Sequence, residues 1–159
     1  MITSRRDYIV RVIEELGRVI ARLSARRKQE NPEETALETI VMGFQRLLVL
    51  DADQIFLLTP DQHFTMLVRD EPPDVARDKV LTYAALSTEA GHVYARKGNA
   101  AIARATWLNA LRFVLKAQTR WSMEGAPDYA PRVDDLLALV KDAPLDAETA
   151  ALLSQAKAS

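Results

Sequence analysis

The chain has 159 residues, enough for one domain with a buried core, and its 21 basic and 22 acidic residues give a formal net charge of −1. That balance argues against nucleic acid or an anionic membrane surface as a partner, and the absence of cysteine excludes disulfides and thiolate chemistry. We expect a cytoplasmic protein, because no apolar run is long enough to cross a bilayer and no signal core follows the first residues.

The N-terminal part of the chain, residues 1–50, is predicted to form a first pair of helices. One helix runs from Arg5 to Lys28, because Ser4 can accept backbone hydrogen bonds at its start and apolar residues recur at helical spacing. The other runs from Pro32 to Leu50. The preceding asparagine is a good N-cap, and proline suits the first helical position.

A short helical insert is predicted over residues 51–70. Asp51 with Gln54, and Thr59 with Gln62, have the spacing of a capping box, in which two side chains bond reciprocally to backbone N–H groups at a helix start. The insert should therefore contain two short helices, each beginning at one of these pairs.

Residues 74–120 are predicted to form a second helix pair. A helix capped by its first residue should run over Asp74–Lys97, and another over Ala100–Arg120. Gly98-Asn99 between them is typical of a tight turn. The spacing predicts two long antiparallel helices with a very short connection.

The last part of the chain, residues 131–157, is predicted to be a C-terminal cap. It contains helices near Arg132–Lys141 and Ala147–Lys157, the second with Asp146 as N-cap. No segment shows the alternation of apolar and polar residues that marks a strand. The predicted fold class is therefore all-α, in a single domain.

The sequence around the Gly98 turn resembles a tetratricopeptide repeat, a family in which two antiparallel helices pack through small residues at fixed places. Small residues allow close approach of the helices, and large aromatic residues fill the space beside them. The matching residues are Gly91, Tyr94, Gly98, Ala103, Trp107 and Ala110. Ser87 and Leu115 depart from the family pattern, which often has a large aromatic residue and a proline there.

A fainter copy of the same spacing lies in the first pair, and its residues are Gly17, Ile20, Ala36, Ile40 and Gly43. The opening Asp7-Tyr8-Ile9 also resembles a group of small bacterial proteins of unknown function that begin with a similar helix. Together the resemblances imply antiparallel helix pairs in a tetratricopeptide-like right-handed superhelix, or an irregular helical bundle with C-terminal capping helices. They imply no established activity.

In tetratricopeptide proteins the first helix of each pair lines a concave groove. By position, the residues placed on that groove are Arg11, Arg18, Arg22, Thr88, His92 and Arg96. Because arginine can hold a carboxylate by two parallel hydrogen bonds, we predict a weakly basic groove that binds an acidic protein or peptide segment. In the alternative interpretation these arginines form a solvated face, paired with Glu14 and Glu15.

No enzymatic activity, metal or cofactor is predicted. Glu89 and His92 form one Glu-x-x-His pair, whereas di-iron bundles use two such pairs with two further glutamates. His63 is expected on the surface of a short helix, since no nucleophile or phosphate-binding motif accompanies it. The alternative function is a small-ligand binder or helical-bundle enzyme with a pocket between the helix pairs, around residues 51–70.

A homodimer is a second possibility for the partner. The predicted helix near residues 132–141 carries four apolar residues, Leu136, Leu137, Leu139 and Val140. These residues could cover the end of the same chain or pair with a second copy. The leading prediction is therefore a protein-interaction or scaffold module.

Overall fold

The computed structural model describes residues 4–141 and 143–158, and every regular element within these ranges is a helix. In chain order the helices are α1 (Arg5–Lys28), α2 (Ala36–Leu48), α3 (Ala52–Leu57), α4 (Pro60–Val68), α5 (Pro73–Arg96), α6 (Ala100–Arg120), α7 (Val133–Leu139) and α8 (Ala147–Ala158). The all-α prediction is confirmed. None of these helices is both long and apolar enough to span a membrane.

Local capping contacts mark four of the helix starts. Capping boxes form at Asp51 and Thr59, as predicted, and another forms at Ser4, which was predicted as an N-cap. The side chain of Asp146 accepts hydrogen bonds from the Thr149 backbone N–H (2.7 Å) and hydroxyl (3.0 Å) at the start of α8. These contacts are made within one helical turn, which explains why the sequence alone located them.

The start of α2 was predicted wrongly. The helix begins at Ala36 instead of Pro32, and the residues between them form a turn. In that turn the Glu33 carboxylate points back to α1, where it pairs with Arg22 (2.5 Å) and Arg26 (3.4 Å). A contact between two elements therefore prevailed over the local helix-start signal.

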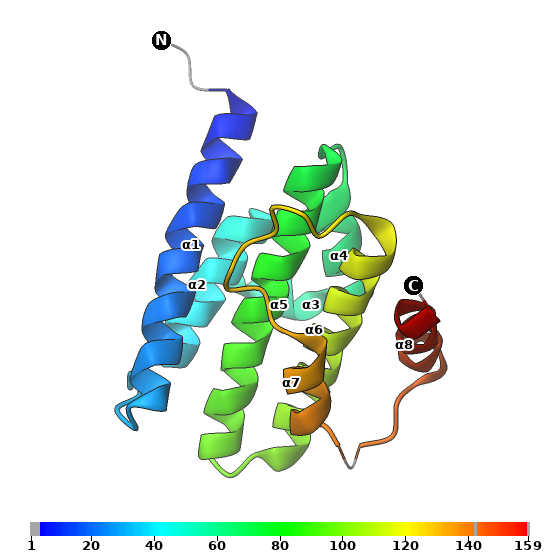
Figure 1. The fold of residues 1–159 in the computed structure, drawn as a ribbon. Helices are drawn as coiled ribbons and strands as arrows, with labels where there is room; N and C mark the ends of the chain where they lie inside the picture. Colours follow the sequence, from blue (N-terminus) through cyan, green and yellow to red (C-terminus); the bar gives the residue numbers. More distant parts are fainter. Residues whose placement is uncertain (1–3, 142, 159) are drawn as a thin grey trace.

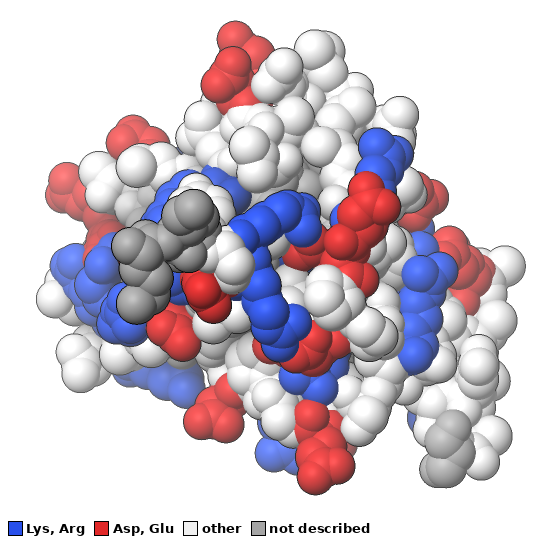
Figure 2. Space-filling view, turned by 90° about the horizontal axis from the view of Figure 1, so that it is seen from above, with Lys and Arg blue, Asp and Glu red and all other residues white. Residues whose placement is uncertain are grey.

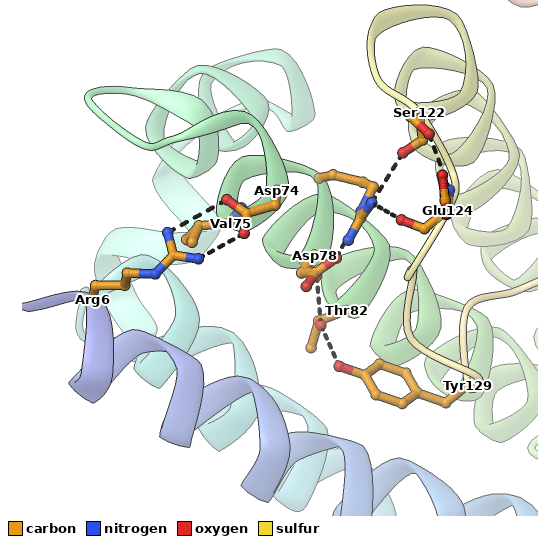
Figure 3. A network of polar contacts seen from close by, with 9 residues as sticks. Arg6, Asp74, Val75, Asp78, Thr82, Ser122, Glu124 and Tyr129 are labelled. Atoms are coloured by element: carbon orange, nitrogen blue, oxygen red, sulfur yellow. Dashed lines mark hydrogen bonds and ion pairs between the residues drawn. The ribbon is translucent and has the colours of Figure 1, made fainter.

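The start of α5 also differs from the prediction. Pro72 is the N-cap residue, and Asp74 lies inside the first turn. The Asp74 carboxylate instead accepts two hydrogen bonds from the guanidinium of Arg6 on α1, at 2.7 and 3.4 Å (Figure 3). The aspartate predicted as a cap thus ties the start of α1 to the start of α5.

Helix α5 is the centre of the molecule. Figure 1 shows α1 and α2 on one side of it and α6 on the other, with α7 crossing in front and α8 against the outer side of α6. Almost every residue of α5 from Val75 to Val93 is buried, including Val80, Leu81 and Leu86. A helix buried on nearly all sides organises the other elements, because each of them needs an apolar surface to cover.

The α5–α6 pair has the close packing that the sequence predicted. Gly98 adopts a φ of 82°, which glycine reaches without steric cost, and closes the connection between the helices. A Cβ atom at Gly91 would overlap the indole of Trp107, so the ring lies directly on the α5 backbone. The Trp107 Nε1–H donates to the Thr88 carbonyl oxygen at 3.1 Å, and Ala103 and Ala110 are buried.

The α1–α2 pair uses its small residues differently. A Cβ at Gly17 would lie 2.7 Å from Cε2 of Tyr129, which comes from the segment between α6 and α7. A Cβ at Gly43 would lie 3.0 Å from Cδ1 of Leu86 on α5. The small residues of this pair therefore admit side chains from outside the pair.

The insert and the C-terminal helices are packed onto this frame. His63, which was predicted on the surface, is 6% exposed, because α4 turns it inward toward α5. Its two ring nitrogens lie 2.7 Å from the Tyr83 hydroxyl and 3.0 Å from the Ile55 carbonyl oxygen. Leu136 and Val140 are buried in the core of their own chain, so this region covers the end of α6.

Candidate functional site

A groove lies between α1, α5 and α7 and has a volume of about 880 Å³. Its floor is α5, with Ala85, Thr88, Glu89 and His92. One wall is the second half of α1, and the other consists of α7 with the residues just before it. The wall from α1 consists of Ile20, Ala21, Ser24, Ala25, Arg27 and Lys28. The wall from α7 and the residues before it consists of Asp128, Tyr129, Ala130, Pro131, Arg132, Asp135, Leu136, Ala138 and Leu139.

The segment of residues 121–132, here called the strap, closes one end of the groove. Figure 3 shows Tyr129 of the strap pointing toward Thr82 on α5, and the two hydroxyl oxygens are 2.7 Å apart. The Tyr129 hydroxyl also lies 3.4 Å from the Ile13 carbonyl oxygen on α1. Burial raises the pKa of Tyr129 to about 12, so the phenol stays protonated and can donate to that carbonyl.

The strap is anchored further along by Arg77. The side chain of this α5 residue is 8% exposed and donates hydrogen bonds to the carbonyl oxygens of Ser122 (3.0 Å) and Glu124 (2.7 Å) (Figure 3). Its Nε also pairs with Asp78 at 2.8 Å. A buried guanidinium bound to two backbone carbonyls fixes the course of the strap, because leaving it unpaired would cost several kcal/mol.

A bidentate ion pair closes the other end of the groove. Arg27 on α1 donates two hydrogen bonds of 3.1 Å to the carboxylate of Glu89 on α5. Beyond this pair is a small cavity beside Arg96, lined by residues of α1, α2 and α5. The Arg27–Glu89 pair belongs to the linings of both spaces, and so it separates them.

His92 is the histidine of the groove floor. Its ring packs edge-on against Trp107 with centroids 5.2 Å apart. Burial lowers the pKa of His92, and the charge of Arg27 lowers it further, while Glu89 acts in the opposite direction. The imidazole is therefore neutral at pH 7 and can serve as either donor or acceptor for a bound segment.

The structure brings together only some of the residues predicted for the groove. Thr88 and His92 lie on its floor, and Arg96 lines the neighbouring cavity. Arg22 is paired with Glu33 as described above, outside the groove lining. The two remaining arginines, Arg11 and Arg18, are exposed on α1 and also lie outside that lining.

Arg11 and Arg18 instead contribute to a charged cluster around Glu15. A hydrogen bond from Arg46 on α2, at 2.5 Å, is the main cause that lowers the pKa of Glu15, and the charges of Arg18 and Arg11 add to it. This neighbourhood agrees with the interpretation that these arginines form a solvated face.

The groove has charges of both signs on its rim. Lys28 and Arg132 are basic, Asp128 and Asp135 are acidic, and none of the four forms an ion pair within the part of the chain that the structure describes. The face of the molecule seen from above also mixes blue and red side chains (Figure 2). The groove is therefore mixed in charge, not basic.

The groove residues that sequence reasoning missed come from the strap, from α7 and from the second half of α1, a helix on which Arg11, Arg18 and Arg22 were predicted instead. Tyr129 closes the groove only because the chain returns to Gly17 after more than a hundred residues, and no local pattern encodes that return. The apolar residues of the predicted helix near 132–141 were the one available signal, but they were assigned to a cap or a dimer contact.

Within residues 4–141 and 143–158, no three His, Cys, Asp or Glu side chains lie together in a way that could hold a metal ion. Glu89, half of the Glu-x-x-His pair, is engaged by Arg27.

Comparison of the chain with protein-family models, curated proteins and solved structures finds no match.

Proposed function

We propose that this protein is an interaction module that binds a segment of another protein in the groove between α1, α5 and α7. The observation that carries the proposal is the groove itself, whose walls are largely apolar and whose floor is a rigid, buried helix. Its volume of about 880 Å³ lies in the upper part of the range in which proteins hold ligands. Such a groove suits the apolar face of an amphipathic helix or an extended peptide.

The order of the helices supports this interpretation. The groove is lined by α1, α5 and α7. The helix that follows each of them in the chain does not line the groove: α2 follows α1, α6 follows α5, and α8 follows α7. Helices α3 and α4 lie between α2 and α5 in the chain. In the tetratricopeptide arrangement the first helix of each pair lines the groove in the same way. The resemblance in sequence and the place of the groove therefore agree for α5, through Thr88 and His92, whereas the arginines predicted on α1 lie outside the lining.

The charges of the rim define the partner more closely than the sequence did. Lys28 and Asp135 are on opposite walls, and neither has an ion-pair partner within the described residues. A segment with an apolar face flanked by an acidic residue on one side and a basic residue on the other would complement both walls. We therefore propose a partner of mixed charge in place of a purely acidic one.

The test is capture of partners from lysate by groove variants. Ala21 on α1 is exposed in the groove wall, and so is Ala138 on α7. Ala21→Arg and Ala138→Arg place a long charged side chain in the groove, and each should reduce the recovery of specific partners at least tenfold. Ala105→Arg, at an exposed position on α6 outside the groove, is the matched control and should capture the wild-type set.

A further variant separates this groove from the arginine face. Arg18→Glu reverses a charge on α1 outside the groove, and we expect the captured set to remain unchanged. If Arg18→Glu abolished capture while the two groove variants kept it, binding would occur on the exposed face of α1 and the proposal would be wrong.

A further inference from the structure

A second, smaller pocket lies at the opposite end of α1 from the Arg27–Glu89 pair. It has a volume of about 100 Å³ and forms where the start of α1, the end of α2 and the first half of α5 meet. Its lining residues are Arg5, Tyr8, Ile9, Val12, Arg46, Leu47, Val49 and Lys79. It shares none of these with the groove described above.

Lys79 gives this pocket a buried cation that is ion-paired with Glu71 but makes no hydrogen bond within the described residues. The residue is 7% exposed. The nearest carboxylate, that of Glu71, is 3.9 Å away, which is too long for a hydrogen bond. Glu71 has a fully buried side chain, and its closest ion pair is with Arg5.

The pocket lining contains three cations, Arg5, Arg46 and Lys79, and, among the residues that the structure describes, no carboxylate. Arg5 and Arg46 are 65% and 42% exposed and pair with Glu71 and Glu15, whereas the Lys79 side chain is buried. Burial lowers the pKa of Lys79. A bound anion would add a hydrogen-bond acceptor for its ammonium.

A path of mixed polarity leads out of the pocket, with Tyr8, Val49 and Leu50 as its apolar residues and Gln45, Arg46, Asp51 and Gln54 as its polar ones. An adjoining hollow of about 390 Å³ shares Tyr8, Arg46 and Val49 with it and reaches Gln54 on α3. Tyr8 is 55% exposed and Val49 81%, although both side chains are large and apolar. These residues give a hydrocarbon chain a surface to cover once its charged end is at Lys79.

Val49 has an unusual backbone conformation. Its φ of 57° and ψ of 49° are left-handed, a region where a β-branched residue is strained and glycine is favoured at a helix end. The side chain meets nothing that would explain the strain, because it points largely into solvent. A strained, exposed valine at the mouth of a pocket is consistent with a role in ligand contact.

We propose that this pocket binds one small aliphatic monocarboxylate. Its carboxylate accepts a hydrogen bond from Lys79, and its hydrocarbon chain lies over Tyr8 and Val49. A volume of about 100 Å³ equals the volume that roughly three water molecules occupy in the liquid. It accommodates a carboxylate and its first carbons, and the rest of the hydrocarbon chain extends into the adjoining hollow. The site is independent of the proposed groove partner, because the two share no residue.

The test is calorimetric titration of the full chain with hexanoate, hexan-1-ol and hexylammonium. Hexanoate should bind with a stoichiometry of one. Hexan-1-ol should bind at least tenfold more weakly than hexanoate, because it lacks the charged hydrogen bond to the ammonium. Hexylammonium should not bind. In the series acetate, butyrate and hexanoate, affinity should increase with chain length.

Two variants and a control locate the site. Lys79→Met should weaken hexanoate binding at least tenfold, and Arg5 still pairs with Glu71 in this variant. The control is Lys97→Met, at an exposed position at the end of α5, which should leave hexanoate affinity unchanged. Val49→Gly should weaken hexanoate about threefold to tenfold while raising the melting temperature, since it removes apolar contact and relieves the backbone.

Two results would overturn the proposal. One is hexanoate binding no more tightly than hexan-1-ol, and the other is Lys79→Met binding hexanoate as the wild type does. If Lys79→Met does not fold, Val49→Gly and the series of chain lengths are the remaining tests. The site is rejected if hexanoate affinity is the same in Val49→Gly as in the wild type and affinity does not increase with chain length.

Discussion

The two helix pairs of this protein have the same spacing of small residues but use them for opposite purposes. In α5–α6 the space above Gly91 is filled by Trp107 of the partner helix, so the small residue joins the two helices of one pair. In α1–α2 the side chains nearest to Gly17 and Gly43 are Tyr129 and Leu86, which belong to other elements, and Leu16 of α1 is a more distant neighbour of Gly43. A small residue creates room, and the neighbour that fills it depends on the rest of the fold.

This difference determines where the binding surface lies. Because Trp107 seals α5 against α6, the free face of α5 is the one turned toward α1 and α7, and it becomes the groove floor. Because Tyr129 is inserted at Gly17, the strap blocks one end of the space between α1 and α5. The second pair thus supplies the rigid floor, and the first pair supplies a wall that the strap holds in place.

The largest expected effect is at Gly91. In Gly91→Ala the new Cβ would overlap the rigid indole of Trp107, which must move and give up its hydrogen bond to the Thr88 carbonyl oxygen. We expect a loss of about 3 kcal/mol in the free energy of unfolding, measured by urea denaturation.

Gly43→Ala is the matched control for this substitution in the first pair. Its Cβ would lie 3.0 Å from the end of the flexible Leu86 side chain, and alanine gains helix propensity of about 1 kcal/mol over glycine. We expect a change of less than about 0.5 kcal/mol. Equal losses in the two variants would show that the pairs are packed alike, contrary to the comparison above.

A smaller effect is expected at Gly17. In Gly17→Ala the new Cβ would lie 2.7 Å from a ring carbon of Tyr129, which can retreat with the strap. We expect a loss of about 1.5 kcal/mol in unfolding free energy, together with faster amide hydrogen exchange in residues 121–132.

The Tyr129→Ala background provides the control for the Gly17 prediction. With the ring removed, Gly17→Ala should no longer destabilise the protein, because the space beside Gly17 is free. An undiminished loss in this background would mean that the cost at Gly17 does not come from Tyr129.

The smallest effect concerns pH. Both histidines of the chain lie in or against the second pair, with His92 on α5 and His63 against Tyr83 of α5. Burial is the main cause that lowers both pKa values below the ordinary 6.5, so the folded state binds fewer protons than the unfolded state near that pH. Stability should therefore fall as pH decreases through 6.5, with an upper limit of about 1.4 kcal/mol per histidine for each pH unit below that value.

The measurement for the pH prediction is the difference in unfolding free energy between pH 7.5 and 5.5 in the wild type and in His92→Gln. The variant should lose about half of the wild-type pH dependence, since His63 retains its share. A difference that is the same in both proteins would show that His92 does not carry this linkage.

The sequence by itself determined the elements of this fold. The starts of α1, α3, α4 and α8 were predicted because their capping contacts are made within one turn, and the α5–α6 hairpin because Gly91, Gly98 and Trp107 lie close together in the chain. Where a distant partner intervened, as Glu33 did with Arg22 and Arg26 on α1, the prediction of a helix start was wrong.

The tertiary structure alone decided the sites. His63 is buried because α4 packs on α5, and the strap closes the groove because Tyr129 meets Gly17. Lys79 makes no hydrogen bond to Glu71 because α5 holds its Nζ 3.9 Å from that carboxylate. Each of these depends on residues brought together from distant parts of the chain. Helix capping and periodicity are local, whereas burial and the pairing of charges are properties of the assembled molecule.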